Sequence, residues 1–177
     1  MSQAPIRKGA VKLKGNPVDL RGPQLKPGDR APVAEVVDNG FQPVKVGGPA
    51  DKVRIFSVVP SLDTPVCDLQ TKRFNQEAGK LPAVQIETIS VDLPFAQKRW
   101  CGAAGVTSVR TLSDHRATAF GDAYGVTIAS PPLERCLARA LFVVDKAGIV
   151  KHAEYVPDIS QHPNYDAALA AAKAASA

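Results

Sequence analysis

The chain has few cysteines, and no two of them lie close together in the sequence. Its 177 residues contain three, at positions 67, 101 and 136. So small and odd a number excludes a disulfide framework, and the spacing excludes a CxxC redox or zinc motif. In a reducing compartment each thiol is therefore free, buried or catalytic.

Long apolar runs are also missing. No stretch approaches the ~20 apolar residues of a membrane span, and the opening MSQAPIRKGAVKLKGNPV has no apolar signal-peptide core. We therefore expect a cytoplasmic protein with no membrane partner. Apolar residues make up 45% of the chain, enough for one core, so residues 1–177 are predicted to form a single domain.

Aromatic residues amount to only 6%, although the net charge is +5. The basic excess lies mostly in residues 1–30, without the interleaved aromatics or recognisable module of a nucleic-acid binder. We interpret this segment as a solvated hairpin and expect no nucleic-acid partner. The three histidines, His115, His152 and His162, lack metal-ligand spacing, so neither a metal nor a cofactor is predicted.

The order of elements indicates the fold class. Residues 1–50 contain short β-prone runs and are predicted to form an N-terminal β-hairpin region. In the core, residues 51–177, the apolar runs 52–59 and 84–92 flank a helical stretch at about 65–80, which makes a βαβ unit. A proline-opened helix follows at 94–105.

The second half of the core continues with a short strand in VRTLSD and a short helix near 116–123. The runs 139–145 and 149–156 are joined by a turn that permits only an antiparallel pair, and an alanine-rich helix closes the chain. A βαβ half followed by a ββα half is the element order of a thioredoxin-like fold. We predict an α/β protein with a central mixed sheet flanked by helices and an N-terminal β-hairpin extension.

Cys67 occupies the position in this order where chemistry is expected. It follows the 52–59 strand in PSLDTPVC, at the first turn of the 65–80 helix, where ligands of α/β sheets gather. Pro65 suits a first helical position, and the free amides there favour a thiolate. A helix terminus contributes only about 0.3–1 kcal/mol, so the Thr64 hydroxyl and a cation are also required. Arg139, which opens the apolar run RALFVVD, is the best candidate for the cation.

Several motifs then resemble one family. Pro60, Thr64 and Cys67 form the pattern P-x-x-x-T-x-x-C, which is similar to the peroxidatic motif of peroxiredoxins. PSLDTPVC, DLPFAQKRWCGAAG, TLSDHR, YGV and ARALFVVD together resemble the thiol peroxidase subfamily, the atypical two-cysteine peroxiredoxins. The resemblance covers about residues 9–174.

The resemblance implies a role for each matching residue. Cys67 is then the peroxidatic cysteine, Thr64 and Arg139 orient the peroxide and hold the thiolate, and Pro60 shields it from water. Cys101 in RWCGA corresponds to the resolving cysteine. Such enzymes reduce hydroperoxides, are recycled by thioredoxin and are usually homodimers. The chain departs from the family at Trp100, where phenylalanine is more familiar, and in having Cys136.

This interpretation predicts movement. Disulfide formation requires α-carbons about 4.4–6.8 Å apart, and two cysteines on different helices of a packed domain are not expected to start there. We therefore expect the first turn around Cys67 to unwind, together with the helix that carries Cys101.

Two other functions are compatible with the residues alone. Cys67 could report oxidation stoichiometrically to a partner, as a redox sensor or binding module. It could also act as the nucleophile of a hydrolase with one of the three histidines. For each cysteine the alternative to reactivity is inert packing, because free cysteine is among the most buried residue types. We interpret Cys136 in that way.

Overall fold

The computed structural model describes residues 4–177 and contains one large mixed sheet, seven strands wide. Its strands lie in the order β10-β9-β5-β6-β7-β3-β4. They are β3 (Ala34–Val37), β4 (Pro43–Val46), β5 (Val53–Val58), β6 (Val84–Ser90), β7 (Arg110–Ser113), β9 (Ala140–Val144) and β10 (Val150–Tyr155). β5, β6 and β7 run parallel, whereas β9 pairs with β5 and β10 in antiparallel fashion. The predicted mixed sheet and thioredoxin-like order are confirmed.

The first two helices begin at the prolines that the sequence indicated and end one or two residues earlier than predicted, and the third begins three residues later than predicted. α1 (Pro65–Ala78) and α2 (Pro94–Ala104) each open with a proline, which has no N–H to leave unpaired in the first turn. Gly105 ends α2 in the left-handed conformation, with φ of 66°, where the lack of a Cβ avoids strain. α3 (Ala119–Ala123) and α4 (Tyr165–Ser176) complete the set of helices.

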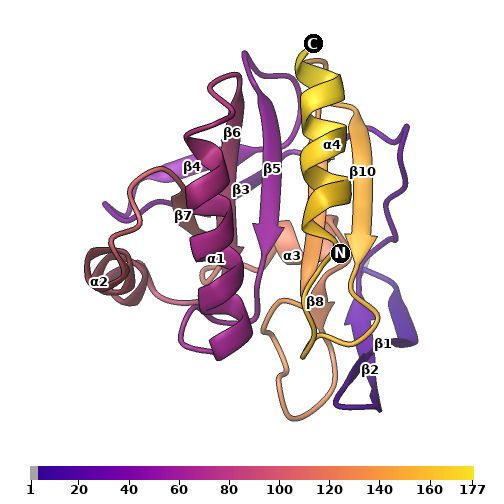
Figure 1. Ribbon diagram of the computed structural model, residues 1–177. Helices are drawn as coiled ribbons and strands as arrows, with labels where there is room; N and C mark the ends of the chain where they lie inside the picture. The colour runs from indigo at the N-terminus through magenta and orange to yellow at the C-terminus, as the bar shows by residue number, and fades with distance from the viewer. Residues whose placement is uncertain (1–3) are drawn as a thin grey trace.

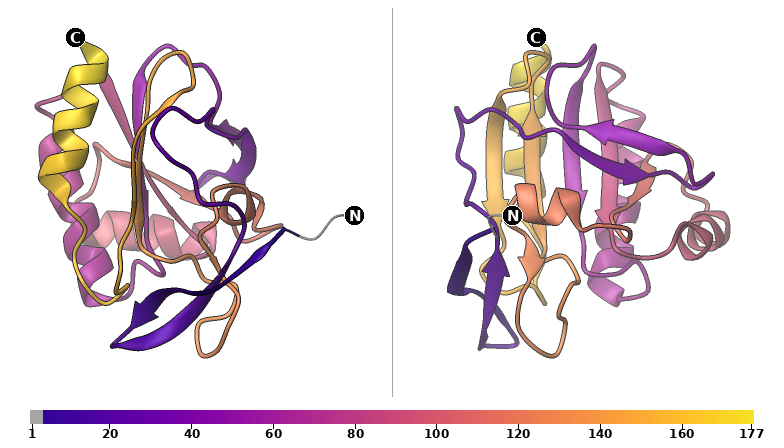
Figure 2. Two further views of the ribbon diagram at one scale, coloured as in Figure 1. Left: turned by 90° about the vertical axis from the view of Figure 1, so that its right-hand side faces the viewer. Right: turned by 180° about the vertical axis from the view of Figure 1, so that it is seen from behind.

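The helices divide between the two faces of the sheet. α1 and α4 lie side by side on one face, and α3 lies on the other (Figures 1 and 2). α2 packs near β7, away from α4 (Figure 1). Cys67 and Phe74 of α1 belong to the apolar core beneath α1 and α4, so α1 directs its reactive face into the molecule.

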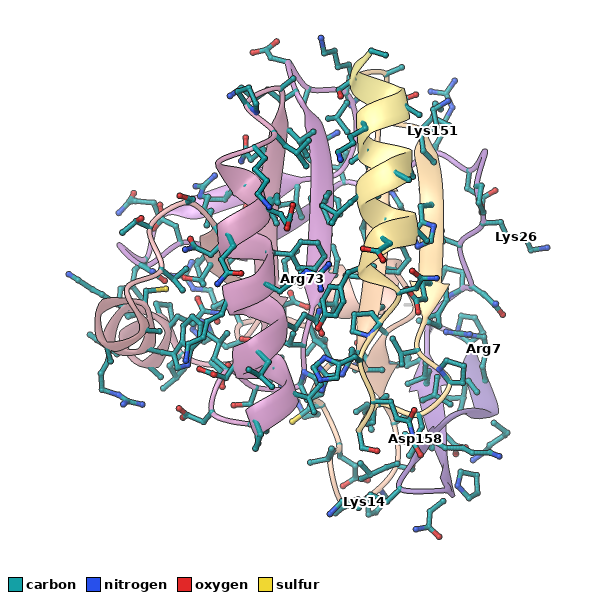
Figure 3. All side chains as sticks on the ribbon, in the orientation of Figure 1. Arg7, Lys14, Lys26, Arg73, Lys151 and Asp158 are labelled. Atoms are coloured by element: carbon teal, nitrogen blue, oxygen red, sulfur yellow. The ribbon has the colours of Figure 1, made fainter. Side chains whose placement is uncertain are left out.

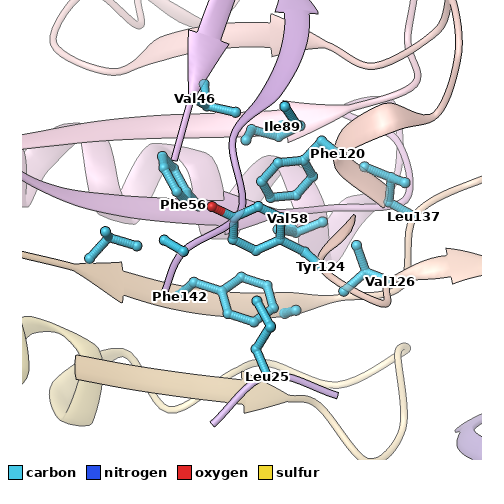
Figure 4. Close-up of a cluster of buried hydrophobic side chains, with 14 of the residues drawn as sticks. Leu25, Val46, Phe56, Val58, Ile89, Phe120, Tyr124, Val126, Leu137 and Phe142 are labelled. Carbon is cyan, nitrogen blue, oxygen red and sulfur yellow. The ribbon is translucent and has the colours of Figure 1, made fainter. Parts of the chain in front are cut away.

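Aromatic rings fill the core on the α3 side (Figure 4). Tyr124 stacks on Phe120 with ring centroids 4.2 Å apart, and both meet Phe56 of β5 edge to face at 5.8 Å. Such pairs contribute about 0.5–1.5 kcal/mol each beyond the area they bury. This core holds β5 rigidly, and β5 leads directly to the loop before Cys67.

The N-terminal region differs in part from its prediction. β1 (Ile6–Leu13) and β2 (Asn16–Arg21) form a hairpin that pairs with the short strand β8 (Thr127–Ile128) in a separate sheet. β3 and β4, although they lie before residue 51, belong to the central sheet. Only β1 and β2 therefore form an extension.

The prediction of a fully solvated hairpin is wrong for one of its basic residues, Arg7. Arg7 donates from Nε to the carbonyl of Gly22 at 2.9 Å and from Nη2 to that of Gly125, and its guanidinium lies 5.1 Å from the centroid of the Tyr155 ring. Burial lowers the pKa of Arg7. This arginine attaches the hairpin to the domain.

Two absences concern the part of the chain that the structure describes. No helix within residues 4–177 is long and apolar enough to cross a bilayer. The same residues contain no cluster of three or more histidine, cysteine and acidic side chains suited to a metal ion.

Candidate active site

Cys67 lies in the first turn of α1, at the carboxyl end of β5. Thr64 is the N-cap residue, with φ −99° and ψ 147°, and Pro65 follows as the first helical residue. The Cys67 side chain has no solvent exposure. The local sequence thus delivers the sulfur to the end of a buried parallel strand, where predicted.

Two side chains donate hydrogen bonds to the sulfur. The Thr64 hydroxyl lies 2.7 Å from Cys67 Sγ, and Nη2 of Arg139 lies 3.4 Å from it. The Thr64 side chain makes no capping bond to its own helix, because its hydroxyl faces the sulfur instead. Hydrogen bonds that involve a charged group are worth about 1.5–3 kcal/mol each, so these two donors are placed to stabilise negative charge that develops at the sulfur.

The Thr64 hydroxyl has only one hydrogen to share between two neighbours. Its oxygen is also 3.2 Å from the carbonyl of Ser61, which can only accept. When the Thr64 hydroxyl donates to the Ser61 carbonyl, its oxygen can accept a hydrogen bond from a protonated Cys67 thiol. When Cys67 is a thiolate, the hydroxyl can donate to a lone pair of the sulfur instead. Rotation of one hydroxyl can therefore accommodate both protonation states of the sulfur.

Arg139 is a buried cation without a carboxylate partner. Its side chain is 2% exposed, and its Nε and Nη1 donate to the carbonyl of Ile159 at 2.9 Å and to Gln70 Oε1 at 2.8 Å. Among residues 4–177, no acidic side chain forms an ion pair with it. A buried charge requires compensation, and Cys67 is the ionisable side chain that Arg139 contacts directly.

Gln70 was not anticipated by the sequence analysis. It is fully buried on α1, one turn after Cys67. Its amide nitrogen donates to the hydroxyl of Ser57 on β5 at 2.8 Å while its oxygen accepts from Arg139. The available signal was a polar residue at i+3 from the cysteine on the apolar face of the helix. Gln70 fixes the position of the guanidinium relative to the sheet.

Asp92 was also missed, and it holds the loop that precedes α1. Its carboxylate accepts from the Ser61 hydroxyl at 2.7 Å and from the Leu62 N–H at 2.8 Å. Asp92 directly precedes Leu93, the N-cap of α2. One carboxylate thus joins the loop before the Cys67 helix to the start of the Cys101 helix.

A mostly apolar pocket of about 390 Å³ opens in front of these groups. Thr64 and Arg139, the two donors to the sulfur, line it together with Pro60. The remaining lining residues are Leu13, Lys14, Pro65, Val66, Leu133, Ile159 and Ser160. A ligand in the pocket would meet the side chains that hold the sulfur, with Pro60 beside them.

Cys101 and Cys67 are both free thiols, and Cys101 packs against the same apolar core to which Cys67 belongs. Cys101 Sγ lies 3.5 Å from the Thr111 hydroxyl on β7, whereas the sulfur of Cys67 contacts Arg139 beside β9. The hydrogen-bond partners of the two sulfurs therefore lie on different parts of the sheet, Thr111 on β7 and Arg139 directly before β9. Within residues 4–177 no disulfide joins the two cysteines.

Cys136 lies in the segment between β8 and β9 and is half-buried. Burial, and after it the charge of Asp92, raises the pKa of its thiol. A raised pKa leaves less thiolate at neutral pH, and the thiolate is the reactive form. These surroundings favour the interpretation of Cys136 as a bystander.

None of the three histidines forms a hydrogen bond with Cys67 in the described part of the chain. His115 Nδ1 lies 2.8 Å from the Ser113 hydroxyl, and His162 Nδ1 lies 2.7 Å from that of Tyr165. His152 has Glu154 at 3.8 Å. A hydrolase requires its base within hydrogen-bond reach of the nucleophile, so the geometry gives the hydrolase hypothesis no support.

Comparisons with known proteins agree on one family. Residues 26–169 match the family model described as Redoxin. The chain is 51% identical to the thiol peroxidase of Halalkalibacterium halodurans over 166 residues, which cover 94% of this chain and 98% of that one. It is also 51% identical to the thiol peroxidase of Bacillus subtilis over 164 residues, 93% and 96% of the two chains.

The solved structures give the same result. The crystal structure of a peroxiredoxin-like protein from Aquifex aeolicus superposes with a TM-score of 0.90 at 44% identity, covering 98% of this chain and 99% of that chain. A thiol peroxidase from Chromobacterium violaceum, at 22% identity and a TM-score of 0.79, shares the fold over 89% and 91% of the two chains.

Proposed function

Because the chain belongs to the Redoxin family and is about half identical to thiol peroxidases, it is a thiol-dependent peroxidase, and we propose that Cys67 is its peroxidatic residue. The observation that carries this assignment is the contact of Cys67 Sγ with a buried arginine that forms no ion pair with a carboxylate in residues 4–177. Thr64, Arg139 and Pro60 complete the proposed catalytic set, and Cys101 is the proposed resolving cysteine.

The chemistry starts with the Cys67 thiolate and a hydroperoxide in the pocket. The thiolate attacks the terminal oxygen of ROOH, the O–O bond breaks, and the alkoxide or hydroxide leaves with both bonding electrons and takes a proton. Arg139 and Thr64 stabilise the negative charge as it moves from sulfur to the leaving oxygen. Cys67 becomes a sulfenic acid and the peroxide becomes an alcohol or water.

Resolution uses the second thiol. The Cys101 thiolate attacks the sulfenic sulfur, an S–S bond forms, and the hydroxide leaves as water after protonation. An external dithiol then reduces the disulfide by exchange and is itself oxidised. Both thiols are free, and their hydrogen-bond partners lie on β7 and directly before β9. We therefore expect both the first turn of α1 and α2 to move before the S–S bond forms.

The partners follow from this cycle. The substrate is a hydroperoxide, and thioredoxin is the proposed reductant because its vicinal dithiol supplies the two electrons that the disulfide requires. A cytoplasmic location provides the reducing conditions under which the thiols are regenerated. A homodimer is proposed on the family resemblance alone.

Peptide mapping after one equivalent of peroxide tests the assignment of the two sulfurs. We expect a disulfide-linked peptide pair that contains Cys67 and Cys101, and a pair that includes Cys136 instead would overturn it. A coupled assay with thioredoxin, thioredoxin reductase and NADPH tests recycling, and many peroxide equivalents should be consumed per protein. A sensor would stop near one equivalent, and the family membership does not favour that alternative.

A further inference from the structure

The β1–β2 hairpin forms part of the wall of the pocket in front of Cys67, and one carboxylate holds it there. Leu13 and Lys14 at the end of β1 line the pocket. In Lys14 and Gly15 the backbone adopts positive φ, 49° and 84°, as a two-residue hairpin turn between Leu13 and Asn16 requires. Such a conformation is unfavourable for lysine, so the turn gains from outside support.

Asp158 supplies that support from the segment after β10. Its Oδ1 accepts from the Lys14 N–H at 3.1 Å and its Oδ2 from the Gly15 N–H at 2.9 Å. Oδ1 also accepts from the N–H of Ser160 at 3.0 Å and from the Ser160 hydroxyl at 2.6 Å. These donors, with those of Ser160 first, hold the pKa of the carboxyl well below its usual range. Figure 3 shows Asp158 beside the β1–β2 hairpin, at the lower right.

Backbone bonds join the same two segments. The N–H of Lys12 donates to the carbonyl of Pro157 at 2.7 Å, and that of Ile159 donates to the carbonyl of Lys12 at 2.8 Å. Ile159 and Ser160 line the pocket, as Leu13 and Lys14 do. Asp158 therefore stands where the two sides of the outer wall meet.

The geometry points to Asp158 as a positioning residue that sets the apolar outer wall of the pocket and so selects hydroperoxides with an apolar substituent over hydrogen peroxide. This inference rests on the proposed function. Hydrogen peroxide needs only Thr64 and Arg139 at the inner end, whereas a bulky hydroperoxide also buries its substituent against Leu13, Ile159 and their neighbours. Burial of apolar surface is favourable in proportion to its area, so the wall contributes only to the larger substrate.

The test compares D158N with D19N. Asparagine places an N–H₂ group where one carboxylate oxygen accepts from the backbone, so at least one bond to the turn is lost. Asp19 lies on β2 of the same hairpin and bonds to Lys8 and to the Gly9 N–H, but it does not line the pocket. D19N thus makes the same charge change as D158N, at a carboxylate that bonds to the same hairpin but lies outside the pocket wall.

We expect D158N to raise the KM for cumene hydroperoxide. The kcat/KM of D158N for hydrogen peroxide should stay within about threefold of the wild-type value. The ratio of kcat/KM for cumene hydroperoxide to kcat/KM for hydrogen peroxide should fall about 10-fold. D19N should leave the ratio of the two kcat/KM values unchanged. An unchanged ratio in D158N, or equal losses with both peroxides, would overturn the inference, because either result would assign Asp158 a merely structural role.

A binding measurement separates this inference from the peroxidase proposal. Cumyl alcohol, the product from cumene hydroperoxide, is unreactive, and its affinity for the reduced protein can be followed by NMR shifts of the pocket residues. D158N should weaken that affinity about 10-fold and D19N should not. Absence of turnover in the wild type would refute the proposed function, whereas equal cumyl alcohol affinities in wild type and D158N would refute the role of Asp158.

Discussion

Nη2 of Arg139 lies 3.4 Å from Cys67 Sγ, although the two residues are 72 positions apart in the chain. The contact exists because β9, which begins directly after Arg139, pairs with β5, which leads to the Cys67 helix. The register of one strand pair thus brings a buried cation to the sulfur. Four of the following predictions test the proposed active site, and a fifth tests the effect of a buried carboxyl group on stability.

The two proposed catalytic cysteines should have different phenotypes. C67S should abolish peroxide turnover, because no sulfur remains to attack the O–O bond. C101S should complete one round of peroxide reduction and accumulate the Cys67 sulfenic acid, which mass spectrometry detects after dimedone labelling. C136S serves as the control and should cycle as the wild type does. Normal cycling of C101S with thioredoxin would refute its assignment as the resolving residue.

Lysine at position 139 should impair the reaction although it keeps the positive charge. A lysine cannot reproduce the three separate bonds of the guanidinium to Ile159, Gln70 and Cys67. We expect R139K to slow the reaction of Cys67 with hydrogen peroxide and with iodoacetamide about 10- to 100-fold, the equivalent of one charge-assisted hydrogen bond. Stopped-flow and alkylation kinetics measure this. R73K, at an exposed arginine on the same face, should react at the wild-type rate.

The amide of Gln70 should matter because it holds the guanidinium. Q70L removes the acceptor of Arg139 Nη1 and the donor to Ser57, which leaves two buried polar groups unsatisfied. We expect a loss of about 10-fold in the rate of Cys67 oxidation. Q76L is the matched control, since Gln76 is exposed on the same helix. Equal oxidation rates in Q70L and Q76L would show that Arg139 is positioned without Gln70.

Oxidation should change the fluorescence of the single tryptophan. Trp100 is 7% exposed and precedes Cys101 in α2, the helix that we propose moves when the disulfide forms. We expect a shift in emission maximum or intensity after one equivalent of peroxide, with recovery on reduction by a dithiol. C101S should show no such change. Identical spectra of the oxidised and reduced wild type would argue against movement of α2.

Asp114 should make stability depend on pH in the acidic range. Burial raises its pKa from 3.8 to about 6, despite N–H donors from Gly121 and Phe120. The folded state therefore binds more protons than the unfolded state between these values, and stability falls as the pH rises from about 4 to 6. Above about pH 7, where the folded protein has also lost this proton, the contribution should be constant.

Denaturant unfolding of wild type and D114N at several pH values measures this effect. The free energy of unfolding of the wild type minus that of the variant should fall by up to about 3 kcal/mol between pH 4 and 7. The other titratable groups are present in both proteins, so their contributions to the pH dependence cancel in this difference. A difference that is flat over this range would mean that Asp114 titrates near its unperturbed value in the folded protein.

Local patterns were sufficient for most elements. The β5-α1-β6 unit was predictable because its strands are continuous apolar runs and its helix opens with Pro65. The end of α2 was predictable from Gly105, because glycine adopts the left-handed backbone conformation of a helix end without strain. The place of β3 and β4 was not predictable, since short β-prone segments fit a separate hairpin as well as the edge of a sheet.

The sequence by itself determined that Cys67 stands at the start of a helix behind a buried strand, with Thr64 one turn ahead, because these are relations between neighbours in the chain. Only the tertiary structure decided that Arg139 lacks a carboxylate partner among the described residues, that Gln70 holds it, and that the hairpin bonded to Asp158 lines the pocket. Those contacts join residues far apart in the chain, and their geometry depends on strand register and packing that no local pattern contains.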